Sequence, residues 1–295
     1  KARLRLDLEE SAKNPKKSAV VPGKLDESEL YTRITTDDDD ELMPPAESGK
    51  SLTADEIELL SRWITEGARW SEHWAYVPPG KHKLPTVKKT SWPANWIDYF
   101  TLRHIEEGGL QPAPDADPVT LLRRLYFDLI GLPPEAGVVD AFRKDPSPKA
   151  YETLVDRLLA SVHYGEQMAS YWLDLVRFAD TVGYHGDQDH SISPYRDWVI
   201  DSFNDNLPFD QFTREQLAGD LLPGATTDQV IATGYNRLLQ TSHEGGVQPR
   251  EYIAMYAADR VRNVSQVWMG ATMGCAQCHA HKYDPYTARD FYAMA

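Results

Sequence analysis

The only two cysteines of the 295-residue chain are Cys275 and Cys278, and His279 follows them directly. Two thiols at this spacing beside an imidazole can attach a cofactor covalently, bind a metal, or alternate between dithiol and disulfide. Two cysteines are too few for a disulfide-stabilised scaffold. The motif is therefore the first candidate for a functional site.

The order Cys-x-x-Cys-His is typical of covalent haem attachment. The two thiols can reach the two vinyl groups on one edge of a porphyrin, and the adjoining imidazole then lies under the ring as the proximal iron ligand. This interpretation uses all three side chains. The sequence therefore favours haem c as the cofactor, with Cys275 and Cys278 binding the porphyrin and His279 binding the iron.

Two other interpretations stay open. A zinc site could combine Cys275, Cys278 and His281 with one distant ligand, although the chain has no further cysteine for a second pair. A redox dithiol or a small structural disulfide is the other alternative. A redox dithiol typically belongs to a βαβ unit, and the sequence has no such pattern.

A haem iron can also take a distal ligand, and two histidines in glycine-containing loops are candidates. These are His243 in "TSHEGGV" and His185 in "GYHGDQDH"; the glycines after His243 would let the backbone approach a flat ring. Alternatively the distal position is open, and polar groups such as Glu244 could then support catalysis. We assign no catalytic residue. Further distal candidates are His190, Met269 and Met273.

The segments that must position these residues have helical periodicity, with proline at starts and glycine at ends. In one of them Met168, Tyr171, Trp172, Leu175 and Phe178 are predicted to share a buried face. No run of alternating strand residues is found, so the predicted class is mainly α. Helices are expected from Pro118 to about Gly131, within 147–165 and within 166–180, over 194–204, 209–217 and 227–234, from near Pro249, and after Thr287.

The N-terminal 72 residues contain a methionine placed like a distal haem ligand. Met43-Pro44-Pro45 precedes a helix predicted over 54–66, which begins with a capping box of Thr53 and Glu56. In class I cytochromes c, the distal methionine lies in a proline-containing loop before the C-terminal helix. Residues 1–72 thus resemble the back half of such a domain; the alternative is a buried methionine beside a turn. The predicted buried face of the helix is Ile57, Leu60, Trp63 and Ile64.

Composition excludes several classes of partner. The chain has 45 acidic and 31 basic residues and a net charge of −14, which argues against nucleic-acid binding and suits a redox partner with a basic surface. No stretch approaches the ~18–20 apolar residues of a membrane span. Residues 73–97, rich in proline and lysine, are predicted to be a linker.

Four long stretches carry a resemblance to a known family: "ELMPPAESGKSLTADEIELLSRWITEGARWSEHWAYVPP", "LYFDLIGLPP", "YRDWVIDSFNDNLPFDQFTREQLAGDLLP" and "CAQCHAHKYDP". They are similar to the planctomycete-type cytochrome c proteins. Those are large exported proteins with an N-terminal cytochrome c domain, then a domain of unknown function with its own CxxCH, then a further C-terminal domain.

The resemblance implies a partial class I cytochrome c-like domain over 1–72, with Met43 as distal ligand of a first haem. A larger all-helical haem domain would follow over 98–295. The first CxxCH and the C-terminal domain of the family are not in this sequence, so we expect a chain truncated at both ends. Because covalent haem attachment occurs outside the cytoplasm, the resemblance also implies a periplasmic or extracellular protein.

The expected function is single-electron transfer by an exported c-type cytochrome. Whether the protein is also an enzyme is open, because a haem with an open distal site could act as a peroxidase or oxidise a substrate. Axial ligation separates these two functions. A zinc-stabilised interaction module is the third and least favoured possibility.

Overall fold

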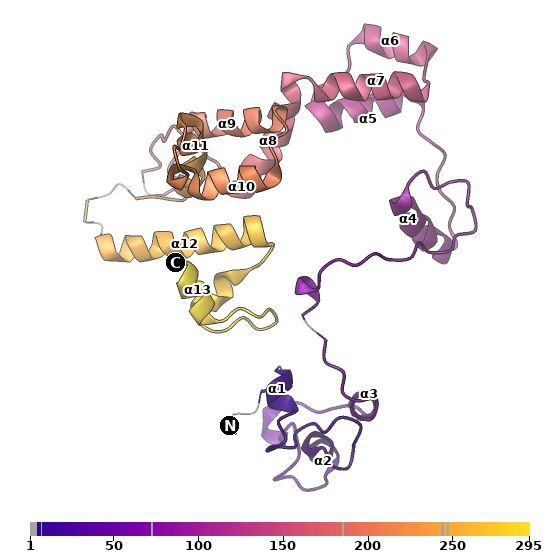
Figure 1. Cartoon of the computed structure of the whole chain (residues 1–295), viewed down its shortest axis with the longest axis vertical. Coiled ribbons are helices and arrows are strands. Elements are labelled where there is room, and N and C mark those ends of the chain that lie inside the picture. Colours follow the sequence, from indigo (N-terminus) through magenta and orange to yellow (C-terminus); the bar gives the residue numbers. More distant parts are fainter. Residues whose placement is uncertain (1–4, 7, 72, 185, 243–244, 247) are drawn as a thin grey trace. The chain divides into compact units, whose positions relative to one another are not determined.

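The computed structural model describes the chain except residues 1–4, 7, 72, 185, 243–244 and 247. It divides into two compact units, residues 1–82 and 83–295. Within the described residues every regular element is a helix (Figure 1). In the same part of the chain the only bridge between extended segments joins Thr181 to Asp189. The predicted mainly α class is confirmed.

The first unit contains α1 (Glu9–Ala12), α2 (Glu29–Thr35) and α3 (Ala54–Thr65). α3 begins at the predicted capping box: the Thr53 backbone N–H donates to Glu56 Oε2 at 2.7 Å, and the Glu56 N–H donates to the Thr53 hydroxyl at 3.3 Å. Ile64 on α3 is fully buried, in a small core with Ala12, Val20 and Ala68. The other residues of the predicted face, Ile57, Leu60 and Trp63, are partly buried.

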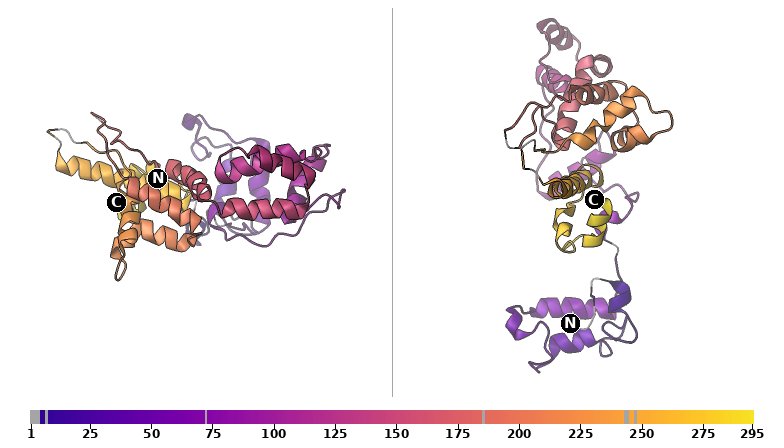
Figure 2. Two further views of the ribbon diagram at one scale, coloured as in Figure 1. Left: turned by 90° about the horizontal axis from the view of Figure 1, so that it is seen from above. Right: turned by 90° about the vertical axis from the view of Figure 1, so that its left-hand side faces the viewer.

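The second unit begins with α4 (Trp96–Glu107), which starts inside the segment predicted to be a linker. A helical layer follows, made of α5 (Pro118–Ile130), α6 (Ala136–Lys144) and α7 (Pro148–Leu159), which Figure 2 shows side by side. α6 was not predicted. Its buried residue Phe142 lies in one cluster with residues of α5 and α7. The buried core of this layer is Leu122, Leu125, Tyr126, Phe142 and Leu158.

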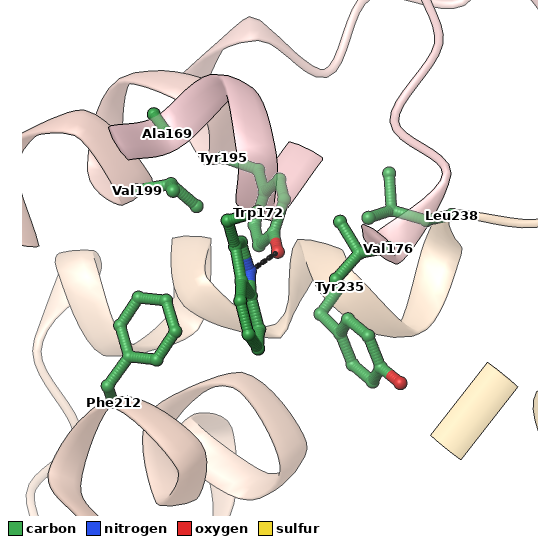
Figure 3. Packing of buried hydrophobic residues seen from close by; sticks show 8 residues of the cluster. All are labelled: Ala169, Trp172, Val176, Tyr195, Val199, Phe212, Tyr235 and Leu238. Carbon is green, nitrogen blue, oxygen red and sulfur yellow. Dashed lines mark hydrogen bonds between the residues drawn. The ribbon is translucent and has the colours of Figure 1, made fainter. Parts of the chain in front are cut away.

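A second core lies between α8 (Val162–Val176), α9 (Ser193–Asn204), α10 (Phe209–Ala218) and the 3-10 turn η4 (Thr233–Arg237). The short helix α11 (Thr227–Ala232) packs against α9 and α10. At the centre of this core the Trp172 indole nitrogen lies 3.2 Å from the Tyr195 hydroxyl (Figure 3). The same nitrogen lies 3.1 Å from Gln216 Oε1. The predicted face of α8 was partly wrong. Ala169, Trp172 and Val176 are the buried residues in its second half, whereas Tyr171 is 63% and Leu175 47% exposed.

The last two helices are α12 (Pro249–Met269) and α13 (Ala288–Met294). α12 is joined to α8 by the ring contact of Trp268 with Trp172, with centroids 5.0 Å apart. An ion pair of Arg177 with Asp259 at 2.8 Å links the end of α8 to α12. No helix in the described part of the chain is long and apolar enough to cross a membrane.

Candidate cofactor-attachment site

The Cys-x-x-Cys-His motif forms one turn between α12 and α13. The 3-10 turn η5 covers Met273–Gln277, and the N–H groups of Cys278 and His279 both donate to the Cys275 carbonyl at 3.4 Å. Met273 and Ala276 are buried under the turn, whereas Cys275, Cys278 and His279 are exposed. The turn therefore packs on one face and presents both thiols and the imidazole to solvent.

Side chains from both neighbouring helices hold this turn. The Tyr292 hydroxyl of α13 donates to the Gln277 carbonyl at 3.0 Å, and the Arg262 guanidinium of α12 donates to the Gln277 side chain. Met273, considered as a distal ligand from the sequence, is 1% exposed and packs within this core. The buried residues under the turn are Ala258, Val261, Ala271, Met273, Ala276, Tyr286 and Phe291.

The backbone orients the His279 ring. Nδ1 of His279 lies 2.8 Å from the Ala280 carbonyl oxygen. A carbonyl only accepts, so Nδ1 must carry the proton, and in the neutral ring Nε2 then keeps its lone pair for a metal. A metal-binding histidine usually has this kind of partner on its other nitrogen.

The donor set fits covalent haem. Cys275 and Cys278 are both exposed, are not bonded to each other, and lie on the same turn as an imidazole whose Nε2 is available. These are the groups that haem attachment requires: two thiols for the porphyrin and one neutral nitrogen for the iron.

The described residues do not form the set of ligands that the zinc interpretation requires. His281 Nδ1 accepts hydrogen bonds from the backbone N–H groups of Asp284, at 2.8 Å, and Tyr283, at 3.3 Å. That nitrogen therefore shapes the loop after the motif. Among the described residues no group of three His, Cys, Asp or Glu side chains could hold a metal ion.

The remaining candidates lie elsewhere or outside the described residues. Met43, in the first unit, is 43% exposed, so the alternative of a buried methionine is wrong and its thioether is accessible. His185, His243 and Glu244 lie outside the described residues. Met269 is 45% exposed at the end of α12, and His190 is partly buried near the end of the 180–190 loop.

Sequence reasoning missed the groups that support the motif. The Ala280 carbonyl is a backbone atom, which no residue pattern reveals. Tyr292 and Arg262 are 15 residues from Gln277 on either side, and they contact it only because α12 and α13 both pack on the turn. No short-range signal in the sequence could have identified them.

The second unit is thus a largely helical domain that carries an exposed Cys-x-x-Cys-His turn. Residues 96–295 match the family model PSCyt2, described as a protein of unknown function (DUF1549), and residues 1–47 match PSCyt1, planctomycete cytochrome C. The first match covers more than half of the chain, which therefore belongs to the PSCyt2 family. The order of the two matches confirms the resemblance drawn from the sequence. No curated protein and no solved structure matched the chain.

Proposed function

We propose that the chain is a c-type cytochrome that binds haem c through Cys275 and Cys278, with His279 as iron ligand, and transfers single electrons. When bound, the haem supplies an iron that changes between the ferric and ferrous states. The observation that carries the proposal is the His279 Nδ1 contact with the Ala280 carbonyl, on the turn that exposes both thiols. The planctomycete cytochrome C match over residues 1–47 supports the same class.

The residues around the turn have defined tasks in this proposal. The Ala280 carbonyl fixes the tautomer of His279, while Gln277, held by Arg262 and Tyr292, fixes the direction of the turn. Arg262 is exposed, and its side chain lies beside Gly274 of the turn. A Cβ atom added at Gly274 would lie 3.6 Å from Arg262 Nε. Its remaining N–H groups are available to the carboxylates of a bound cofactor.

The proposal extends to location, partner and the first unit. Covalent haem attachment implies a periplasmic or extracellular protein, and the net charge of −14 favours a redox partner with a basic surface. Met43 lies within the planctomycete cytochrome C match and is exposed. We assign it as the distal ligand of a haem in that domain.

The test is to produce the chain in a bacterial host that matures c-type cytochromes. The pyridine haemochrome spectrum should be that of a thioether-linked haem, and the intact mass should exceed that of the polypeptide by one haem. A colourless protein with the bare polypeptide mass, from a host that matures a reference cytochrome normally, would overturn the proposal.

Two variants locate the attachment. The double variant Cys275→Ala/Cys278→Ala should lose covalent haem, and His279→Ala should change the axial ligation seen in the visible spectrum. His104→Ala is the matched control, because the His104 side chain is 81% exposed on α4. Low-spin six-coordinate iron in the unaltered protein would agree with electron transfer, whereas five-coordinate iron that binds small ligands would favour a haem enzyme.

A further inference from the structure

Three neighbouring pockets of the second unit share the same two basic side chains. Their volumes are about 280, 350 and 330 Å³, and His190 and Arg237 line all three. Arg177 lines the first pocket and Arg260 the third. We call the region formed by these four residues the cationic pocket.

The described residues that line the cationic pocket include no Asp or Glu. This contrasts with the whole chain, in which acidic residues outnumber basic residues by 45 to 31. The adjoining loop carries Asp180, Asp187 and Asp189, but none of them lines the three pockets. The Asp187 carboxylate accepts a hydrogen bond from the Gly183 N–H at 2.8 Å.

The four basic residues differ in whether they have partners. Arg177 forms two hydrogen bonds with the Asp259 carboxylate, at 3.0 and 2.8 Å, and this interaction raises the pKa of its guanidinium. Arg260 donates to the Asn236 carbonyl at 2.9 Å. Within the described part of the chain, the guanidinium of Arg237 and the imidazole of His190 have neither a hydrogen bond nor an ion pair. Their N–H groups are therefore available to a ligand.

The walls of the cationic pocket are held in place. The backbone N–H of His190 donates to the Asp180 carbonyl at 2.7 Å, and the Gln240 side chain donates to the Gly183 carbonyl at 2.9 Å. Arg177 has the left-handed backbone φ of 63°, which is costly for a residue with a Cβ and is stabilised here by Asp259. The apolar lining residues Val182 and Leu238 are 4% and 6% exposed, so they belong to the fixed interior.

We propose that the cationic pocket binds a small anion, whose carboxylate or other oxyanion group contacts Arg237 and His190. A guanidinium can donate two parallel hydrogen bonds to such a group, and the buried apolar residues can contact the remainder of the molecule. A metal cation is disfavoured because the lining is positively charged. The proposal concerns a second ligand and does not depend on haem attachment.

The cationic pocket adjoins the Cys-x-x-Cys-His turn, which we call the attachment turn. Ser242 and Tyr256 line the pocket of about 330 Å³ that belongs to the cationic pocket. They also line a further pocket of about 300 Å³, and Gln277 of the Cys-x-x-Cys-His turn lines this further pocket too. A molecule bound at Arg237 would thus lie in a series of pockets that leads to the proposed haem site. Such a position suits an anionic substrate or effector of the haem protein.

The test is isothermal titration calorimetry, in which the full chain is titrated at constant ionic strength with malonate, phosphate or sulfate. Glucose is the uncharged control. At least one anion should show saturable binding at least about tenfold tighter than glucose. A preference for malonate identifies a carboxylate ligand, and a preference for phosphate or sulfate identifies a tetrahedral oxyanion. The absence of saturable anion binding would overturn the proposal.

Variants connect the binding to the cationic pocket. Arg237→Gln and His190→Asn should each weaken binding of the preferred anion by roughly tenfold or more. The first replaces a charged guanidinium that can donate two parallel hydrogen bonds by a neutral amide, and the second replaces the imidazole by a shorter neutral side chain. Arg124→Gln is the control, since Arg124 is exposed on α5 and lines none of these pockets. Unchanged affinity in Arg237→Gln, with an unchanged circular dichroism spectrum, would contradict the assignment. Equal binding by Cys275→Ala/Cys278→Ala would separate this result from the haem proposal.

Discussion

His279 and His281 are two residues apart and have different hydrogen-bond roles. Nδ1 of His279 donates to a carbonyl and leaves Nε2 available, whereas Nδ1 of His281 accepts from the Asp284 N–H and organises a loop. The sequence predicts that the motif is functional, because two cysteines and a histidine at this spacing have few structural explanations. It cannot predict which ring nitrogen is free, because that depends on backbone atoms brought close by folding.

Met43 is predicted to contribute little to stability without a bound haem. Its side chain is 43% exposed, so Met43→Ala should change the free energy of unfolding by less than about 0.5 kcal/mol. Ile64→Ala is the comparison in the same unit. Ile64 is fully buried, and its truncation should cost about 2–5 kcal/mol. Chemical denaturation of both variants checks this, and equal losses would show that Met43 packs in a core.

The hydrogen bonds of Trp172 should also be measurable. Trp172→Phe removes the indole N–H that lies 3.1 Å from buried Gln216, and it should lower the free energy of unfolding by about 1–3 kcal/mol. Tyr171→Phe alters the neighbouring residue, whose ring is 63% exposed, and should have almost no effect. Urea denaturation of both variants tests this. A similar cost for the two substitutions would contradict the observed face of α8.

At the scale of elements, the features set by local sequence were predicted well. The capping box at Thr53, the helix after Thr287, and the prolines at the starts of α5 and α12 are observed as expected. The face of α8 was predicted less well, because Tyr171 and Leu175 are apolar enough to be core residues. Tyr195 and Phe212, which are distant in sequence, determine that Trp172 packs inward.

The capping box of α13 should make stability depend on pH. Hydrogen bonds from the Thr287 backbone N–H and hydroxyl lower the pKa of Asp290 below its ordinary value of 3.8. A lowered folded-state pKa contributes stability that is fully present above the unfolded pKa and is lost as the pH falls through the folded pKa. Acidification below about pH 4 should therefore weaken the start of the helix that follows the attachment turn.

Melting temperatures measured between about pH 3 and pH 7 test this linkage. Asp290→Asn should reduce the acid-dependent decrease, because its side chain does not ionise. Asp140→Asn is the control, since Asp140 is exposed on α6. Identical pH profiles for the unaltered protein and Asp290→Asn would show that this cap contributes nothing to acid stability.

At the scale of the whole molecule, the division after residue 82 predicts a protease-sensitive connection. Between α3 and α4 the described residues contain only the short turn η2 (Trp74–Tyr76), and Lys81 and Lys83 are exposed. Extended surface segments are cleaved before packed helices. Brief trypsin treatment should therefore cut first after Lys81 or Lys83 and release two fragments that resist further digestion.

Mass spectrometry of the fragments identifies the cleavage sites. Lys81→Gln/Lys83→Gln should slow the first cut, whereas Lys149→Gln on α7 should leave its rate unchanged. First cleavage within α5 or α12 would mean that the two units do not form the most stable parts of the chain.

The placement of the attachment turn has a consequence for biogenesis. Met273 and Ala276 complete the interior beneath the turn, while the two sulfurs and the imidazole remain outside it. If the proposed haem is attached at this turn, a maturation enzyme could reach the reactive atoms of the folded domain without opening it. Attachment would then be a late step that follows folding of the polypeptide.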